Sequence, residues 1–278
     1  MLLESRLYTF IDSKNAFTLS FLEGQKLIHD LAIIHNIKGK GFAYFRDSVL
    51  TAMPLISYLK QGEGMGIFLD SEDPFFRLKI EANQAGYMRT LLIPEDFQEF
   101  PSKVSGIARL SKTFPNNPKP YTSIIQLNQI DFHDVINKII QESYQMDAKV
   151  VISDKSDQSI LLSRLPDRNV NKEEREERDS LNEYWIKTQA KIQAIFEKSL
   201  NEQETIQKAF EDLGFEYLSG VDVAFKCSCS RERMVQGIQS LCQTHSVEEI
   251  FENKNDIETK CDYCKTHYLI QRSDLTLN

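Results

Sequence analysis

Apolar and polar positions along the first 166 residues follow two periods, one typical of strands and one typical of helices. Apolar runs on either side of a polar stretch at residues 12–15 predict a β-hairpin over residues 3–21. Apolar side chains at helical spacing over residues 27–34 and 49–59 predict two helices, the second ended by glycines. Three further apolar runs, divided by short polar turns, predict a small meander at 65–70, 75–82 and 87–93.

The pattern becomes less regular after residue 93. Four prolines between residues 101 and 120 predict a loop-rich stretch, followed by a strand at 121–127 and a helix at 132–145. Two more strands are expected at 150–152 and 160–165. Because strands and helices come in this mixed order, without a steady strand–helix repeat, the sequence favours an α+β domain that ends near Pro166.

The composition changes at residues 171–180, which carry no apolar side chain. Asn171 can cap a helix with Glu174 at the third helical position, and opposite charges four residues apart support that helix. A narrow apolar stripe at helical spacing follows, formed by Leu181, Trp185, Thr188, Ile192 and Phe196. A second helix is expected over residues 202–213, ended by Gly214. Since a narrow stripe stabilises a helix only when it is buried, this segment must dock on another surface or remain marginally stable.

All five cysteines lie within the last 52 residues of the chain. Four of them form a CxC pair and a CxxC pair separated by 31 residues: Cys227, Cys229, Cys261 and Cys264. Thiolates are preferred ligands of Zn²⁺, which takes four of them tetrahedrally, so this spacing predicts a zinc site. The alternatives are two structural disulfides, which a cytosolic chain disfavours, and unrelated buried cysteines, which the tight spacing disfavours.

The fifth cysteine and the histidines offer other ligands. Cys242 falls inside a helix predicted at 230–242, and we expect it to be a small buried core residue. His245 and His267 each follow a cysteine by three residues, so either could replace a thiolate in a Cys₃His site. Four cysteines already complete the tetrahedral set, and we therefore expect these histidines to lie at the surface or to support the ligands.

With 278 residues, of which 41% are hydrophobic and 27% charged, the chain has the composition of a globular protein of about two domains. The predicted fold class is α+β, with a larger mixed N-terminal domain, a helical linker and a small C-terminal zinc-binding module. We place the core domain at 1–168, the charged helical linker at 169–219 and the zinc-binding domain at 220–278.

Charge and hydropathy limit the partners of the chain. The N-terminus lacks the apolar core of a secretory signal, and no 18 apolar residues run together, so the sequence predicts a cytoplasmic protein that does not enter a membrane. A net charge of −8 disfavours nucleic acid, and residues 226–272 carry seven basic and seven acidic side chains, which gives no basic face. A zinc ribbon that binds nucleic acid or a protein partner through a purely structural zinc remains the alternative function.

We expect no enzymatic activity. A catalytic zinc keeps one coordination position open for water, whereas four thiolates fill it. The glycine-rich residues 62–66 lack the Lys-Ser/Thr of a phosphate loop and predict a turn. Four thiolates nevertheless make a redox-sensitive site, because the thiolate is the form that attacks oxidants and loss of the metal would destabilise a small module.

The cysteine-bearing segments resemble those of the redox-regulated molecular chaperones of the heat shock protein 33 family. Residues 225–233 (FKCSCSRER) and 257–268 (IETKCDYCKTHY) carry the resemblance most strongly, since CxC followed at this distance by CxxC is the signature of that family. Residues 142–145 and 158–166 are similar to corresponding parts of its larger domain.

The resemblance implies an ATP-independent chaperone (holdase) that acts in the stress response. Reduced, Cys227, Cys229, Cys261 and Cys264 would hold zinc and the chaperone would be inactive. Oxidants would form the disulfides Cys227–Cys229 and Cys261–Cys264, release zinc, unfold the C-terminal module and destabilise the linker. The protein would then bind unfolding client proteins, as a homodimer in many members. The candidate client-binding residues lie on the linker stripe: Leu181, Trp185, Ile192 and Phe196.

Overall fold

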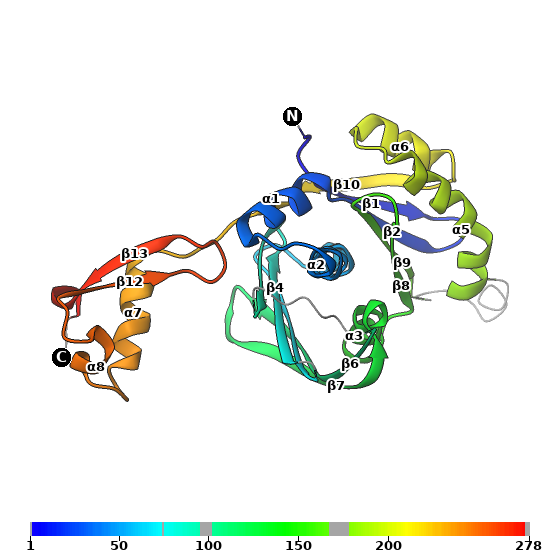
Figure 1. The fold of residues 1–278 in the computed structure, drawn as a ribbon. Helices are drawn as coiled ribbons and strands as arrows, with labels where there is room; N and C mark the ends of the chain where they lie inside the picture. Colours follow the sequence, from blue (N-terminus) through cyan, green and yellow to red (C-terminus); the bar gives the residue numbers. More distant parts are fainter. Residues whose placement is uncertain (1, 74, 95–101, 167–177, 276–278) are drawn as a thin grey trace. The chain divides into compact units, whose positions relative to one another are not determined.

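The computed structural model describes residues 2–73, 75–94, 102–166 and 178–275 (Figure 1). The chain divides into two compact units, Met1–Phe225 and Lys226–Asn278. The sequence predicts a boundary between residues 219 and 220. In the structure residues 220–225 belong to the first unit, because strands β10 (Glu216–Asp222) and β11 (Ala224–Phe225) pair with strands of that unit. The helix cap predicted at Asn171 lies outside the described residues.

The first unit contains a five-stranded antiparallel sheet, called sheet A here, in the order β10-β1-β2-β9-β8. Its other strands are β1 (Arg6–Asp12), β2 (Phe17–Glu23), β8 (Ala148–Ile152) and β9 (Gln158–Arg164). Strands β1 and β2 confirm the predicted hairpin. The carboxylate of Asp12 accepts hydrogen bonds from the backbone and side-chain nitrogens of Asn15, at 3.0 and 2.6 Å, and so closes the turn.

A second sheet, sheet B, has six strands in the order β11-β5-β4-β3-β6-β7. Strands β3 (Gly64–Glu72), β4 (Phe75–Asn83) and β5 (Tyr87–Ile93) form the predicted meander, which is confirmed. Strands β6 (Lys103–Phe114) and β7 (Asn117–Asp131) extend it antiparallel on the far side of β3, and β11 pairs parallel with β5.

The prediction of a loop-rich stretch at 101–120 is therefore wrong over β6. The inward positions of β6 include Gly106, which has no side chain, and Ala108, whose side chain is small, so the alternation that marks a strand is hidden. Gly106 adopts φ +143°, and a Cβ there would lie 2.1 Å from the carbonyl oxygen of Asp70 on β3. Pro118 and Pro120 are tolerated because β7 is an edge strand of sheet B.

Helices fill the space between the two sheets, and Figure 1 shows α2 end-on between them. They are α1 (Gln25–His35), α2 (Lys40–Ala52), the 3₁₀ helix η1 (Met53–Tyr58) and α3 (Val135–Ile139). The largest apolar cluster joins side chains of both sheets to these helices, for example Leu22, Phe45 and Ile67. The helix expected at 49–59 begins earlier, at Lys40, and its last turns tighten into η1, where Pro54 donates no backbone hydrogen bond.

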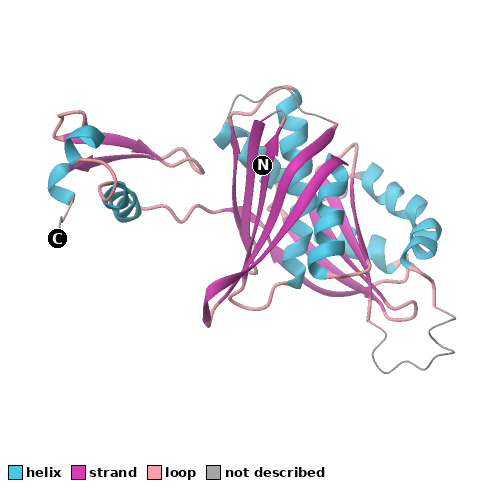
Figure 2. Cartoon of the chain, turned by 90° about the horizontal axis from the view of Figure 1, so that it is seen from below, coloured by secondary structure: helices cyan, strands magenta, loops and turns pink. Residues whose placement is uncertain are grey.

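Two helices cover the other face of sheet A, opposite α2 (Figures 1 and 2). These are α5 (Leu181–Lys198) and α6 (Gln203–Glu211), which confirm the helix predicted to carry the apolar stripe and the helix predicted at 202–213. The predicted start of the first helix near Asn171 is not continuous with α5, because residues 178–180 are not helical and Ser180 caps α5. Both faces of sheet A are thus covered by helices, which explains why β2 is buried at six of its seven positions.

The second unit is small and consists of α7 (Arg231–Leu241), α8 (Val247–Phe251) and the hairpin β12 (Asp256–Lys260) and β13 (His267–Gln271). The predicted helix at 230–242 is confirmed, with the Ser230 hydroxyl capping it at the backbone nitrogen of Arg233. Among residues 226–275, which the structure describes, the apolar cluster has four buried members: Ile238, Phe251, Ile270 and Leu275. So small a core needs an additional cross-link to be stable. Among the described residues, no helix is both long enough and apolar enough to span a bilayer.

A buried carboxyl group makes the stability of the first unit depend on pH. Glu23 is 3% exposed, and burial raises its pKa from 4.5 to about 7, although the backbone nitrogen of Gln25 donates to it. The folded chain therefore binds one more proton than the unfolded chain between these values. We expect the free energy of unfolding to fall by on the order of 3 kcal/mol as pH rises from about 4.5 through 7. In urea titrations, a Glu23→Gln variant should lack this fall, and an equal fall in the variant would contradict the assignment.

Candidate metal centre and docked helices

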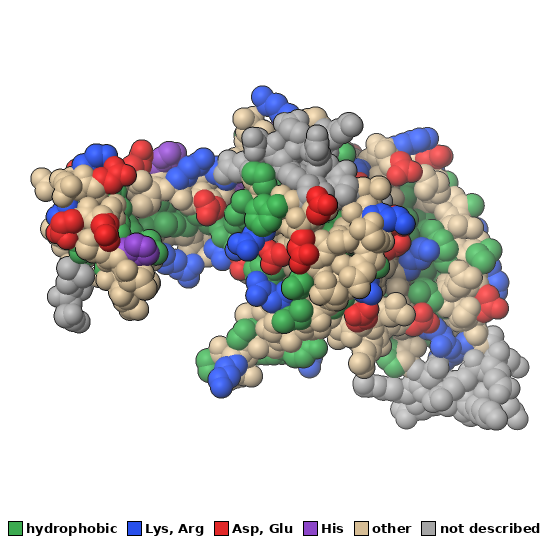
Figure 3. All heavy atoms as spheres, turned by 60° about the horizontal axis from the view of Figure 1, so that its bottom comes forward, with side chains coloured by type: hydrophobic (Ala, Val, Ile, Leu, Met, Phe, Trp, Pro, Cys, Tyr) green, Lys and Arg blue, Asp and Glu red, His purple; other side chains and the backbone are tan. Residues whose placement is uncertain are grey.

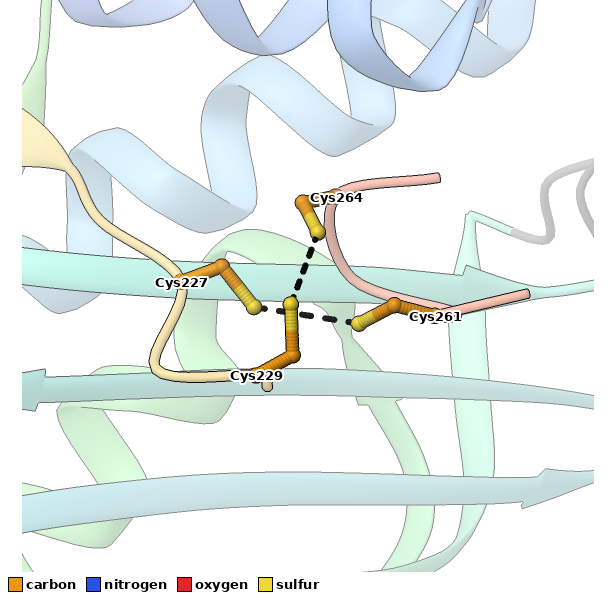
Figure 4. A group of neighbouring side chains, drawn as sticks. All are labelled: Cys227, Cys229, Cys261 and Cys264. Atoms are coloured by element: carbon orange, nitrogen blue, oxygen red, sulfur yellow. Dashed lines mark hydrogen bonds between the residues drawn. The ribbon is translucent and has the colours of Figure 1, made fainter. Parts of the chain in front are cut away.

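Four cysteine sulfurs of the second unit converge on one point (Figure 4). Cys227 and Cys229 lie on the segment before α7, and Cys261 and Cys264 lie on the turn between β12 and β13. All four sulfur atoms are within 4.8 Å of one another, with 3.7 Å between Cys227 and Cys261 and 3.2 Å between Cys229 and Cys264. The structure thus brings together the four predicted ligands, and all are free thiols.

Local backbone geometry presents the CxxC pair. The backbone nitrogen of Cys261 donates to the carbonyl oxygen of Thr266 at 2.9 Å, and that of Lys265 donates to the carbonyl of Cys261 at 2.8 Å. Lys265 adopts a left-handed conformation at φ +61°, which turns the chain back into β13. Both sulfurs of this pair therefore sit on one tight turn.

The donor set fits a tetrahedral thiolate metal. Zinc–sulfur bonds of roughly 2.3 Å place tetrahedral sulfurs about 3.8 Å apart, within the range of the separations found here. Cys261 is 4% exposed and the other three are half-buried, so one ligand is shielded from water and three remain partly accessible. Four thiolates are a ligand set typical of structural zinc, and these four cysteines could hold a metal ion.

The two ends of the cluster differ in their surroundings. Burial raises the pKa of the Cys227 thiol to about 12. Burial acts in the same direction on Cys264, but hydrogen bonds with Thr266 and with neighbouring sulfurs outweigh it and lower the pKa of Cys264 to about 6. The Tyr268 hydroxyl lies 3.0 Å from the Cys229 sulfur, and this hydrogen bond raises the pKa of Tyr268 to about 12. Tyr268 therefore stays protonated and can donate a hydrogen bond to the sulfur of Cys229.

The other candidate ligands lie elsewhere. Cys242 is half-buried and packs against the apolar cluster of the second unit. His267 places Nδ1 3.1 Å from a carboxylate oxygen of Glu258, and His245 places Nδ1 2.9 Å from the Thr244 hydroxyl.

On the face drawn in Figure 3, basic and acidic side chains of the described residues are interspersed.

The predicted client-binding residues lie on α5, which packs on sheet A. Ser180 and Glu183 form a capping box at its start. Ile192 and Phe196 are each 1% exposed within an apolar cluster shared with sheet A, and Leu181 and Trp185 are partly buried at its edge. The stripe is therefore docked. The sequence missed Tyr184 and Ile195, which are each 4% exposed and belong to the same buried face. Helical spacing counted from Tyr184 passes through Ile192 and Ile195, so the sequence carries a signal for both residues.

The start of α5 is fixed to the β1–β2 hairpin. The Tyr184 ring stacks on Phe17 with 3.9 Å between ring centroids, and its hydroxyl donates a 2.7 Å hydrogen bond to the buried carboxylate of Asp12. On α6, Phe210 packs against Phe10 with 4.7 Å between ring centroids. The aromatic side chains of sheet A therefore form the platform on which both helices rest.

The end of α5 is held by polar contacts from the β8–β9 turn and from the first residue of β9. The Gln158 side-chain nitrogen donates to the carbonyl oxygen of Leu200 at 2.6 Å. The Ser156 hydroxyl donates to the carbonyl of Phe196 at 3.4 Å. The Ser156 contact adds to the backbone hydrogen bond from Ser199 at a carbonyl of the last turn of α5, and the Gln158 contact holds the chain two residues beyond the end of the helix.

The fold and the cluster together define a two-unit α+β protein whose small C-terminal unit carries a four-thiol site. The sequence model described as Hsp33 protein matches residues 5–271. The chain belongs to the Hsp33 family, which agrees with the resemblance in the cysteine motifs.

Individual relatives agree with this assignment. The chain is 26% identical over 163 residues to a 33 kDa chaperonin of Shewanella frigidimarina, and 25% identical over 165 residues to one of Pseudomonas syringae pv. tomato. Each alignment covers 58% of this chain and 54% of the relative, so the chain spans about half the length of the curated relatives it matches. The crystal structure of the 33 kDa chaperonin (heat shock protein 33 homolog) of Thermotoga maritima is similar in fold. Its TM-score is 0.71 at 12% identity, over 98% of this chain and 96% of that one.

Proposed function

We propose that this protein is a redox-regulated, ATP-independent holdase, inactive when reduced and activated by oxidation. The convergence of four sulfurs within 4.8 Å, in a unit with very little apolar core of its own, carries the proposal. Membership of the Hsp33 family and the names of its relatives support the chaperone role.

Cys227, Cys229, Cys261 and Cys264 would hold Zn²⁺ in the reduced protein. Bound zinc would keep the four sulfurs as thiolates and would tie the CxC segment to the β12–β13 turn. The chain itself supplies a tight turn, a buried Cys261 and hydroxyl groups at Cys229 and Cys264. The cross-link would replace the stability that four buried apolar side chains do not provide.

Oxidation would pair the cysteines within each motif, Cys227 with Cys229 and Cys261 with Cys264. For each disulfide, two thiolates give two electrons to hydrogen peroxide, which takes up two protons and leaves as two molecules of water. Disulfide sulfurs no longer carry the negative charge that holds a metal ion, so zinc would leave and the second unit would lose its cross-link.

The division into a core domain at 1–168, a linker at 169–219 and a redox domain at 220–278 describes how we expect the change to spread. Strands β10 and β11 follow α6, and Cys227 lies one residue after β11. Unfolding of the redox domain would therefore release the C-terminal end of the segment that these two strands form. Undocking of α5 would then expose Leu181, Trp185, Ile192 and Phe196, together with the aromatic face of sheet A. Exposed apolar area flanked by charged residues would bind unfolding clients and stay in solution.

Clients would be unfolded or partly unfolded proteins, recognised through apolar surface. The oxidised form would act as a homodimer in the cytoplasm, where reduction keeps the thiols ready for zinc.

The proposal is tested by treating the zinc-loaded, reduced protein with peroxide and following zinc release and the aggregation of a heat-unfolded client in the same sample. We expect one zinc to leave per chain and aggregation to be suppressed only after its release. Zinc that stays bound, with no effect on aggregation, would sink the proposal. A salt-dependent mobility shift of nucleic acid by the reduced protein would favour the zinc-ribbon alternative instead.

A further inference from the structure

The hydroxyl group of Tyr268 is aimed at one sulfur of the cysteine cluster. Tyr268 lies on β13, paired with Thr259 on β12, and its hydroxyl oxygen is 3.0 Å from the sulfur of Cys229. Cys229 belongs to the CxC motif, 39 residues earlier in the chain. The contact therefore exists only when the hairpin and the CxC segment are folded together.

The Tyr268 ring is held in place independently of this contact. It packs against the apolar cluster formed by Ile238, Phe251, Ile270 and Leu275. Its backbone carbonyl accepts a hydrogen bond from the Thr259 hydroxyl at 3.4 Å. A ring fixed by packing and by strand pairing points its hydroxyl at the sulfur at little further entropic cost.

We propose that Tyr268 slows the reaction of Cys229 with peroxides and so sets the oxidant threshold of the switch. The inference rests on the proposed function. In the reaction, a sulfur lone pair of the thiolate attacks a peroxide oxygen and the O–O bond breaks, giving a sulfenic acid and, after protonation, water. A second thiolate then attacks that sulfur and expels hydroxide, which leaves as water when protonated. A hydrogen bond donated to the thiolate occupies the lone pair that must attack, and the sulfur is less reactive while it is made.

The position of Tyr268 separates this role from metal binding. Its phenol is not one of the four converging ligand atoms, which all belong to cysteines. Removal of the hydroxyl leaves the ring, the strand pairing and the ligands unchanged. The Tyr268→Phe change should therefore alter the rate of oxidation by peroxide more than the rate at which zinc is lost to a chelator.

The test compares the full-length wild type with Tyr268→Phe, each reduced and loaded with zinc. Zinc release is followed with a chelating dye over a range of peroxide concentrations, and separately with the dye alone. We expect the second-order rate constant with peroxide to rise about three- to tenfold in the variant, because the reactivity of a thiolate changes by only about half of the free energy of a hydrogen bond to its charge. Release to the dye alone should change by less than about twofold. Ser240→Ala, which removes an exposed hydroxyl from α7, is the matched control and should behave as wild type.

Two outcomes would overturn the inference and leave the proposed function standing. An unchanged or slower peroxide rate in Tyr268→Phe would show that the hydroxyl does not protect the sulfur. An equal rise with and without peroxide would show a purely structural role. If wild type keeps its zinc in peroxide, the proposed function itself fails, and the inference fails with it.

Discussion

A Cys261→Ser variant is expected to lose zinc and to unfold the second unit while the first unit stays folded. Cys261 is the most buried of the four cysteines, at 4% exposure, and a serine hydroxyl does not ionise to serve as a ligand at neutral pH. Zinc sites of this kind contribute about 10 kcal/mol or more to folding. Four buried apolar side chains cannot replace that contribution. Metal analysis should find no zinc in the variant, and limited proteolysis should cut within residues 226–275.

The matched control is Cys242→Ser, which changes the cysteine that lies outside the converging set. It should keep one zinc per chain and resist the protease as wild type does. A Cys261→Ser protein that retains a full equivalent of zinc and a protected second unit would contradict the assignment of the ligands.

A Phe196→Ala variant is expected to bind clients without oxidation. Phe196 is 1% exposed and packs between α5 and sheet A, near Phe21 at 6.4 Å between ring centroids. Loss of a buried phenylalanine side chain costs about 3–5 kcal/mol. We expect this loss to exceed the free energy that keeps α5 docked on sheet A. Undocking should shift the fluorescence of Trp185, the single tryptophan of the chain, to longer wavelength. The reduced variant should also suppress aggregation of a heat-unfolded client.

Ile186→Ala is the control on the same helix, because Ile186 is 58% exposed and lies away from the sheet. It should leave both the fluorescence and the oxidant requirement unchanged. If reduced Phe196→Ala is as inactive as wild type although its Trp185 emission has shifted, undocking of α5 does not activate the protein.

The convergence of the four cysteines could be predicted because the spacing of short motifs indicates it. Two pairs of cysteines with fixed spacing place four sulfurs on two turns, whatever the surrounding fold. The predicted helix at 230–242 separates Cys242 from the four metal-ligand candidates. In the structure Cys242 packs against the apolar cluster of the second unit. Tyr268 could not be found this way, because only the pairing of β12 and β13 brings its hydroxyl to Cys229.

The fold was predictable where hydrophobic alternation is regular, as in the β1–β2 hairpin and the β3–β5 meander. It was not predictable over β6, where Gly106 and Ala108 occupy inward positions that a strand pattern fills with larger side chains. The stripe on α5 was placed on the correct helix but slightly off its buried centre. Its centre is set by partners far away in sequence, such as Asp12, 172 residues from Tyr184. Partners at such separation leave no local pattern.

Amide hydrogen exchange before and after peroxide tests most directly whether oxidation of the cysteines releases the docked helices. Amides of α5 (Leu181–Lys198) and of residues 226–275 are expected to lose protection together once zinc has left. Amides of β2 and β9 should stay protected beneath them. Continued protection of α5 after complete release of zinc would contradict this expectation.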